Sequence, residues 1–209
     1  MSVPMIIGIL TLHSNTNFGG GLQQIALFES LKALGHEPRF LCVQNNVTES
    51  VARRLLGIIS SYSLRQLFDA IHEAFRRITV KNEPETPNCI LYNKTDEFNY
   101  TCLNYTPKFG LDELPGYVAA CDALVFGSDQ VWTDVYSSVL PYFGDGMPEF
   151  RGAKIAYAAC SVHRRVPIFN RSKIRALLSD FDAVSVRDET TRQLVRTYSS
   201  LNPHLVCDP

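Results

Sequence analysis

The chain has 209 residues, of which 45% are hydrophobic and 20% charged, and its formal net charge is -1. This composition excludes a disordered chain, and the near-neutral charge argues against a nucleic-acid-binding protein, which needs a concentrated basic surface. The length suits one sizeable domain or one lobe of a two-lobed protein. No stretch approaches the ~20 apolar residues that span a bilayer, and the short apolar run after Met5 does not resemble a signal peptide.

The six cysteines are scattered through apolar or strand-like segments and form no C-x-x-C pair. We therefore expect reduced thiols in a cytoplasmic protein, with no disulfide framework and no zinc site. These cysteines are Cys42, Cys89, Cys102, Cys121, Cys160 and Cys207.

The first predicted unit spans residues 6–34. An apolar run leads into a polar, glycine-rich turn and then into a helical stretch that ends near Gly35, a residue suited to a left-handed helix end. A first strand that delivers a loop to a helix N-terminus is typical of nucleotide-type α/β domains. Gly19, Gly20 and Gly21 would let a ligand approach the backbone closely.

Two features limit what this turn predicts. The strict G-x-G-x-x-G fingerprint and the Walker A lysine are both absent, so a tight turn with no ligand is an equally good interpretation. In the helix that follows, the spacing of Leu27, Leu31 and Leu34, with Leu22 and Ala26 nearby, predicts the face that packs on the sheet.

The middle of the chain carries weaker signals. Residues 38–43 predict a second strand, and apolar positions at helical spacing predict a helix over 63–77. Residues 81–113 are polar and proline-punctuated, and form either a plain connector or an inserted loop over a binding cleft.

Strands and helices alternate in the rest of the chain. This alternation predicts a Rossmann-like α/β fold, a parallel sheet with helices on both faces. The strands are expected at 122–126, 154–159, 183–186 and 203–206, and helical segments at 117–121, 172–178 and 190–198.

Polar clusters follow four of the expected strands, at residues 13–21, 127–130, 161–163 and 187–189. Ligands of open parallel sheets bind beyond the carboxyl ends of the strands. We therefore expect these four clusters to meet at one rim and to form half of a cleft.

Five motifs in the same order resemble the polysaccharide pyruvyl transferase family and span nearly the whole chain. They are Gly8-Ile-Leu with Asn17-Phe-Gly-Gly-Gly-Leu-Gln-Gln, Gly127-Ser-Asp-Gln-Val-Trp132, Lys154-Ile-Ala-Tyr-Ala-Ala with Ser161, Val184-Ser-Val-Arg-Asp-Glu189, and Asp208-Pro209. The resemblance implies a two-lobed, glycosyltransferase B-like architecture, of which residues 1–209 would be the N-terminal lobe.

The resemblance also implies the reaction. The family transfers the enolpyruvyl part of phosphoenolpyruvate to a sugar as a ketal, with phosphoenolpyruvate as donor substrate and no further cofactor. The family's phosphoenolpyruvate contacts come largely from a second lobe, through a histidine and basic residues that have no counterpart in this sequence. We therefore expect this chain to supply the acceptor side of a polysaccharide or precursor sugar site, and to be inactive without the missing C-terminal lobe.

Within this interpretation Asp129 and Arg187 are the expected catalytic residues. Asp129 would grip or deprotonate an acceptor hydroxyl, or else cap the following turn. Arg187 would hold a phosphate or carboxylate, or else pair with Asp188 or Glu189.

The remaining candidates are expected to bind substrate. Trp132 would stack on a sugar ring or be buried, with both interpretations equally weighted, and Ser161 would line the cleft. His13 and His163 are candidate acids, although a lone histidine in a loop is usually structural, and no residues at metal-ligand spacing are found. The expected substrate-binding residues are Asn17, Gly19, Gly20, Gly21, Ser128, Gln130, Trp132 and Ser161.

Two other functions fit the same residues. One is a non-catalytic sugar- or nucleotide-binding module that kept the fold. The other is a glycosyltransferase-like enzyme that uses a nucleotide-sugar donor. A second lobe with a histidine and arginines facing the cleft would favour the pyruvyl transferase, and a nucleotide-sugar motif would favour the last alternative.

Overall fold

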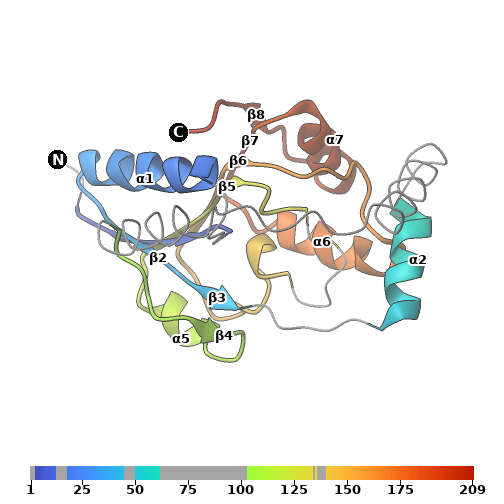
Figure 1. The fold of residues 1–209 in the computed structure, drawn as a ribbon, viewed down its shortest axis with the longest axis horizontal. Coiled ribbons are helices and arrows are strands. Elements are labelled where there is room, and N and C mark those ends of the chain that lie inside the picture. The colour runs from blue at the N-terminus through green and yellow to red at the C-terminus, as the bar shows by residue number, and fades with distance from the viewer. Residues whose placement is uncertain (1–2, 13–17, 45–49, 62–102, 134, 136–139) are drawn as a thin grey trace, which may run out of the picture.

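Six strands form a central sheet in the order β2-β1-β5-β6-β7-β8, and every neighbouring pair is parallel (Figure 1). The computed structural model describes residues 3–12, 18–44, 50–61, 103–133, 135 and 140–209. The predicted parallel α/β sheet is confirmed. Because the strands run in one direction, the segments that leave their carboxyl ends all lie at one edge of the sheet.

Strands and helices alternate along most of the described chain. In chain order they are β1 (Ile6–Leu10), α1 (Phe18–Ala33), β2 (Glu37–Phe40), β3 (Val43–Gln44), α2 (Val51–Ser61), β4 (Phe109–Gly110), α5 (Leu114–Ala119), β5 (Ala123–Asp129), the 3-10 helix η1 (Pro141–Phe143), β6 (Ala153–Ala159), the 3-10 helix η2 (Ile168–Asn170), α6 (Arg171–Leu178), β7 (Ala183–Val186), α7 (Glu189–Tyr198) and β8 (His204–Leu205).

Helices cover both faces of the sheet, as predicted. Side chains alternate between the faces along β5, so Val125 belongs to the core under α1, whereas Leu124 and Phe126 belong to the core that α5 and α6 close. Figure 1 shows α1 on one side of the sheet and α5 on the other. Six of the seven β5 residues are buried, which explains why this strand is an almost continuous apolar run.

The second strand ends earlier than its apolar sequence predicts. β2 stops at Phe40, and Val43–Gln44 forms a separate parallel pair with β4. The described end of the expected connector, residues 103–113, lies along β2. There Phe40 N donates to Asn104 O at 2.8 Å, and the rings of Phe40 and Tyr105 stack 4.8 Å apart.

The predicted packing face of helix α1 is confirmed at Leu27 and Leu31, which pack in one core cluster, and is wrong at Leu22 and Leu34. Leu22 is 52% exposed and Leu34 is 65% exposed, whereas Leu27 and Phe28 are buried. Gln24 is also buried, because its amide donates to Leu12 O at 3.0 Å and its side-chain oxygen accepts from Tyr105. Leucine spacing alone does not predict this face fully, because Gln24 occupies a buried position with its side chain hydrogen-bonded.

Several expectations lie outside the described residues. These are the helix over 63–77, the polar connector from 81 to 102, and the turn at 13–17. Gly35, with φ of +89°, ends α1 in the left-handed conformation as expected. None of the helices in the described ranges has the length and apolar character needed to cross a membrane.

Candidate active site at the carboxyl edge of the sheet

The chain reverses its direction of progress through the sheet between β1 and β5. From β1 it moves outward to β2, and β5 then continues on the opposite side of β1. Connections therefore leave the carboxyl ends of these two strands in opposite directions, which leaves a crevice between them. Thr11 Oγ1, just after β1, donates to Ser128 O in β5 at 2.8 Å and joins the two strand ends.

The end of β5 has an unusual backbone. Gly127 has φ of +113°, and a Cβ there would lie 2.3 Å from Tyr157 O on β6, so only glycine fits. The following peptide bond, Gly127-Ser128, is cis. Asp129 has φ of +81°, a left-handed conformation that aspartate adopts more readily than most residues. Residues other than glycine held at positive φ, such as Asp129, concentrate at functional sites.

A chain of polar contacts runs across the edge from α1 to the C-terminal segment. Ser128 Oγ donates to Gln23 Oε1 at 3.3 Å, and Gln23 Nε2 donates to Asp208 Oδ2 at 2.7 Å. Arg187 Nη1, just beyond β7, donates to the same Asp208 oxygen at 3.1 Å. Four segments distant in the sequence, α1, β5, the exit of β7 and the C-terminal segment, thus meet through side chains.

Asp129 completes this cluster. Its Oδ1 lies 3.9 Å from Arg187 Nη1, so the two groups form an ion pair, while the shorter contact of the guanidinium goes to Asp208. The side chains of Asp129, Arg187 and Asp208 are 16%, 26% and 27% exposed. We call Gln23, Ser128, Asp129, Arg187 and Asp208 the edge cluster.

Of the two roles considered for Arg187, the ion pair with Asp188 or Glu189 is wrong. Asp188 caps α7, accepting from Thr191 N at 2.8 Å, and Glu189 pairs with Arg192 at 2.7 Å. Burial disfavours the charged form of Arg187, but contacts with Cys160 and Asp208 outweigh it and raise the pKa of the guanidinium. Arg187 is therefore a permanent cation.

The charges of the edge cluster suit a hydroxyl ligand better than an anion. Two carboxylates surround one guanidinium, so an incoming phosphate would meet a formal charge of -1 and would have to displace a carboxylate from Arg187. Asp208 Oδ1 is buried and has no hydrogen-bond partner within the described part of the chain. A buried acceptor without a partner is costly, and a ligand hydroxyl would satisfy it.

Two expected ligand contacts are wrong. Trp132 has no exposed surface. It stacks on Phe143 with ring centroids 5.0 Å apart, and its Nε1 donates to Tyr142 O at 2.8 Å. The burial alternative for Trp132 therefore holds. Ser161 is 2% exposed, and its hydroxyl closes a turn with the backbone of His163.

The other residues expected to bind substrate differ in exposure and in location. Gly19, Gly20 and Gly21 lie in the first turn of α1 and not in a loop before it; Gly19 is exposed, and the other two are buried. Ser128 is buried within the edge cluster, and Gln130 is exposed just beyond β5. Asn17 lies outside the described residues.

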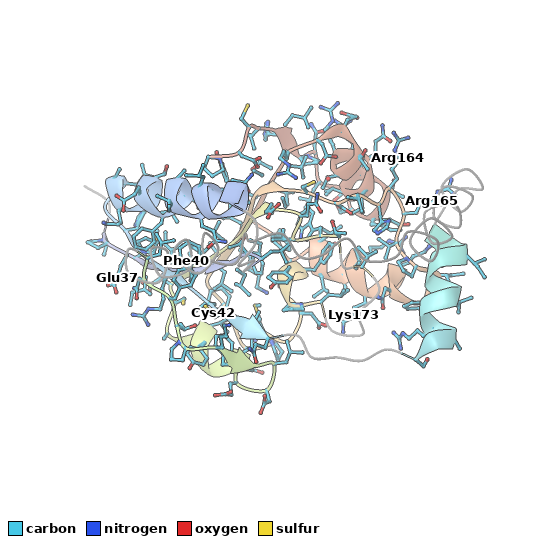
Figure 2. All side chains as sticks on the ribbon, viewed as in Figure 1. Glu37, Phe40, Cys42, Arg164, Arg165 and Lys173 are labelled. Carbon is cyan, nitrogen blue, oxygen red and sulfur yellow. The ribbon has the colours of Figure 1, made fainter. Side chains whose placement is uncertain are left out.

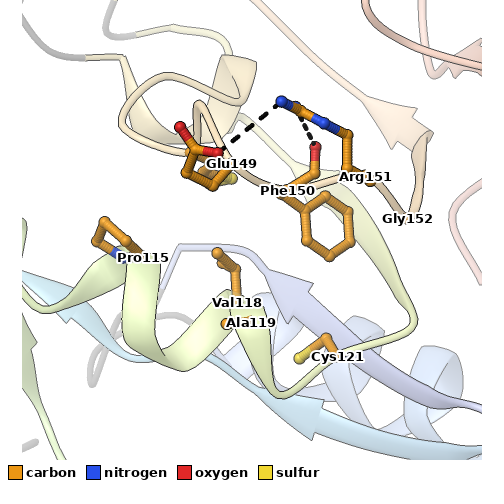
Figure 3. A pocket seen from close by; sticks show the side chains of 9 residues that line it. Pro115, Val118, Ala119, Cys121, Glu149, Phe150, Arg151 and Gly152 are labelled. Carbon is orange, nitrogen blue, oxygen red and sulfur yellow. Dashed lines mark hydrogen bonds and ion pairs between the residues drawn. The ribbon is translucent and has the colours of Figure 1, made fainter.

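Two hollows lie away from the edge cluster. One of about 240 Å³ separates α5 from the segment before β6, lined by Val118, Cys121 and Phe150 among others, with Arg151 and Glu149 at its mouth (Figure 3). Another of about 440 Å³ includes Lys154 and Asp180. Their lining residues precede β5, β6 and β7, so both hollows lie at the amino edge. The convergence of charged side chains favours the carboxyl edge as the site.

Sequence reasoning missed Gln23 and Asp208 as site residues, although both stand in the motifs of the family resemblance. Among the residues that the structure describes, no group of three or more His, Cys, Asp or Glu side chains is placed to hold a metal ion.

The fold and the edge cluster define a doubly wound α/β domain with a polar site at the crevice between β1 and β5. The family model for polysaccharide pyruvyl transferase matches residues 17–209, nearly the whole chain. The chain belongs to the polysaccharide pyruvyl transferase family, as its motifs predicted. No curated protein and no solved structure gives a significant match.

Proposed function

We propose that this protein transfers a pyruvyl group from phosphoenolpyruvate to a sugar of a polysaccharide or its precursor, and that the described lobe holds the acceptor sugar. The observation that supports this is the edge cluster, in which Asp129, Arg187 and Asp208 from three separate segments converge at the β1–β5 crevice. Membership of a transferase family supplies the reaction class.

The proposed reaction forms a ketal from two hydroxyls of one sugar. The oxygen of the first hydroxyl bonds to C2 of phosphoenolpyruvate while C3 gains a proton and becomes a methyl group. The oxygen of the second hydroxyl then displaces phosphate from C2, and the C–O bond to phosphate breaks. One hydroxyl proton balances the proton that C3 gains, and the other leaves with the phosphate.

In this proposal Asp129 accepts the proton of an attacking hydroxyl. The carboxylate of Asp129 is held less tightly by Arg187 than that of Asp208, because the guanidinium lies nearer to Asp208. Asp208 and Gln23 are positioning residues: they fix the orientation of Arg187 and of the Ser128 hydroxyl. Asp208 Oδ1, which has no hydrogen-bond partner among the described residues, receives a second hydroxyl of the sugar.

Calorimetry tests the acceptor role on this chain directly. We expect sugars with two neighbouring free hydroxyls to bind, whereas their O-methylated forms and phosphoenolpyruvate alone bind at least tenfold more weakly. Asp208→Asn keeps the shape of the side chain and removes its charge, so it should weaken sugar binding while the thermal midpoint stays close to that of the wild type. Binding of phosphoenolpyruvate in preference to sugars would contradict the proposed acceptor role.

Turnover is measured separately, as acceptor-dependent phosphate release with the ketal identified by mass spectrometry. The assay contains the chain and phosphoenolpyruvate, with and without a second lobe from a family member. Release of phosphate with a ketal product supports the transfer. Saturable sugar binding without any phosphate release under both conditions favours a non-catalytic binding module, and turnover with a nucleotide-sugar donor favours the other transferase.

A further inference from the structure

Helix α2 turns apolar side chains away from the rest of the molecule. Leu56 and Ile59 lie on one stripe of the helix and are 50% and 67% exposed. A neighbouring stripe carries Arg53, Gly57 and Ser60, and these residues are buried or half-buried. A surface helix normally buries apolar side chains and exposes polar ones, so these five described residues of α2 have the reverse arrangement.

The contacts of α2 confirm which stripe faces the body. Ile168 N donates to Ser60 Oγ at 3.3 Å, and Arg171 Nη2 donates to Ser60 O at 3.4 Å. The guanidinium of Arg53 lies over the ring of Phe169, 4.5 Å from its centroid. Polar and cation–π contacts thus attach α2 to η2, while Leu56 and Ile59 stay exposed.

The segment that carries η2 extends the apolar surface. Val162 is 49% exposed and Ile168 is 57% exposed. Together with Leu56 and Ile59, they make up four of the eight exposed large hydrophobic residues in the described part of the chain. The exposed apolar surface is therefore concentrated on these two neighbouring elements.

The same part of the chain is rich in basic residues, although one of them, Lys173, pairs with Asp145 at 2.6 Å. Residues 50–61 and 161–179 contain seven arginines and lysines and no aspartate or glutamate, although the whole chain has 20 basic and 21 acidic residues. Arg164 and Arg165 are exposed, and Figure 2 labels both at the periphery, on the side of the molecule where α2 lies. We call Leu56, Ile59, Val162, Arg164, Arg165 and Ile168 the α2 patch.

We propose that the α2 patch binds the surface of an anionic lipid membrane. Apolar side chains enter the boundary between headgroups and acyl chains, and arginines contact the lipid phosphates, as in other interfacial helices. A nucleic acid would leave the apolar side chains without a partner. Figure 1 places α2 at one end of the described part of the molecule, where a flat lipid surface can reach it.

The location of the α2 patch relates membrane binding to the position of the edge cluster. Ser161 begins the segment directly after β6, where Cys160 N donates to Asp129 O at 3.0 Å. The segment that carries Val162, Arg164 and Arg165 therefore leaves the same edge of the sheet as the edge cluster. A membrane-bound molecule would present its acceptor site near the lipid surface.

Vesicle co-sedimentation tests this proposal without reference to catalysis. The purified chain is mixed with phosphatidylcholine vesicles that contain or lack phosphatidylglycerol. We expect binding to the anionic vesicles, weakened by salt because exposed charges are screened. Arg164→Glu with Arg165→Glu should weaken binding at least tenfold, and Leu56→Ser with Ile59→Ser about tenfold.

Matched controls come from other surfaces of the same chain. Leu34 is 65% exposed just after α1, and the side chain of Arg151 is 77% exposed at the amino edge. Leu34→Ser and Arg151→Glu should bind vesicles like the wild type, with folding checked by circular dichroism for every variant. The proposal is overturned if the wild type ignores anionic vesicles, if the controls lose as much binding as the patch variants, or if the chain binds polyglutamate but not lipid.

Discussion

The N-cap of α7 lies beside the edge cluster, and its loss should have a measurable cost. The carboxylate of Asp188 accepts from Thr191 N at 2.8 Å and from Thr191 Oγ1 at 3.0 Å. The hydroxyl of Thr191 in turn accepts from Ser161 N at 2.8 Å, so the cap links α7 to the turn after β6. Asp188→Ala removes this acceptor and leaves the fully buried Thr191 only the contacts of its hydroxyl with Ser161.

The expected loss is about 1–2 kcal/mol, the upper part of the range for a helix N-cap. For a chain of this size, each 1 kcal/mol lowers the thermal midpoint by about 2–4 °C, so Asp188→Ala should melt roughly 2–8 °C below the wild type. Asp188→Asn keeps an acceptor for the backbone N–H and should lose less than half as much. Glu189→Ala, which removes only a surface ion pair, should change the midpoint by about 1 °C or less.

The loss should also depend on pH. Burial opposes the charged form of Asp188, but hydrogen bonds from Cys160, Thr191 and Thr190 outweigh it and lower the pKa of the carboxyl below its ordinary 3.8. A lowered folded-state pKa contributes stability above the unfolded pKa, and that stability is lost as the pH falls through the folded value. The gap between wild type and Asp188→Ala should thus be full at about pH 7 and smaller at about pH 3.

Scanning calorimetry of the three variants at both pH values measures this gap. An Asp188→Ala midpoint equal to that of the wild type at neutral pH would refute the cap. A gap of the same size at both pH values would refute the role of the carboxylate charge.

Three further predictions concern the strands under the site. Gly127→Ala should lower the free energy of unfolding by about 4 kcal/mol or more, because residue 127 has a positive φ and its new Cβ would lie 2.3 Å from a β6 carbonyl oxygen. Urea unfolding measures this loss. Gly116→Ala, in open space on α5, is the control and should be neutral or stabilising. Trp132→Phe removes a buried hydrogen bond of 2.8 Å and should lower stability by about 2–4 kcal/mol without a specific loss of sugar affinity at temperatures where the variant is folded. Burial raises the pKa of the Cys160 thiol from 9.0 to about 11, so at pH 8 its thiolate fraction is about a hundredth of that of an ordinary cysteine. Iodoacetamide should therefore modify the exposed Cys207 well before Cys160, and mass spectrometry of the labelled protein measures the order.

The strands and helices after residue 120 could be predicted closely from the sequence. β7 has the expected bounds, and β6, α6 and α7 each begin one residue earlier than their apolar periodicity indicates. Buried parallel strands are short apolar runs, and each is followed in this chain by a polar turn and an amphipathic helix. These signals are local, so a single sequence carries them.

The packing of α1 could not be predicted in the same way. Leu22 and Leu34 fit a leucine stripe, yet the buried face contains Gln24 because two partners from elsewhere in the chain satisfy its amide. Trp132 shows the opposite problem: it follows a strand end among polar residues, but η1 and Phe143 cover its ring. In both cases the residues that decide burial lie outside the stretch of sequence in which the local pattern is seen.

The meeting of Asp129 with Arg187 followed from topology, because parallel strands bring their carboxyl ends together. The partners within the cluster did not follow. Gln23 contacts Asp208 across 185 positions of sequence, and Arg187 selects Asp208 over its immediate acidic neighbours. Side-chain pairing depends on where the C-terminal segment lies, and nothing in the sequence near Asp208 records that position.

The catalytic role of Asp129 is tested most directly by comparing Asp129→Asn with the wild type in the acceptor-dependent phosphate-release assay, run with the second lobe present, alongside thermal unfolding of both proteins. Asn keeps the size of the side chain and tolerates the positive φ of residue 129, so the thermal midpoint should move by no more than about 2 °C. We predict that kcat falls at least 100-fold, because the base that accepts the hydroxyl proton is lost. An Asp129→Asn variant with wild-type kcat, or one whose activity falls only as far as its stability does, would contradict this role.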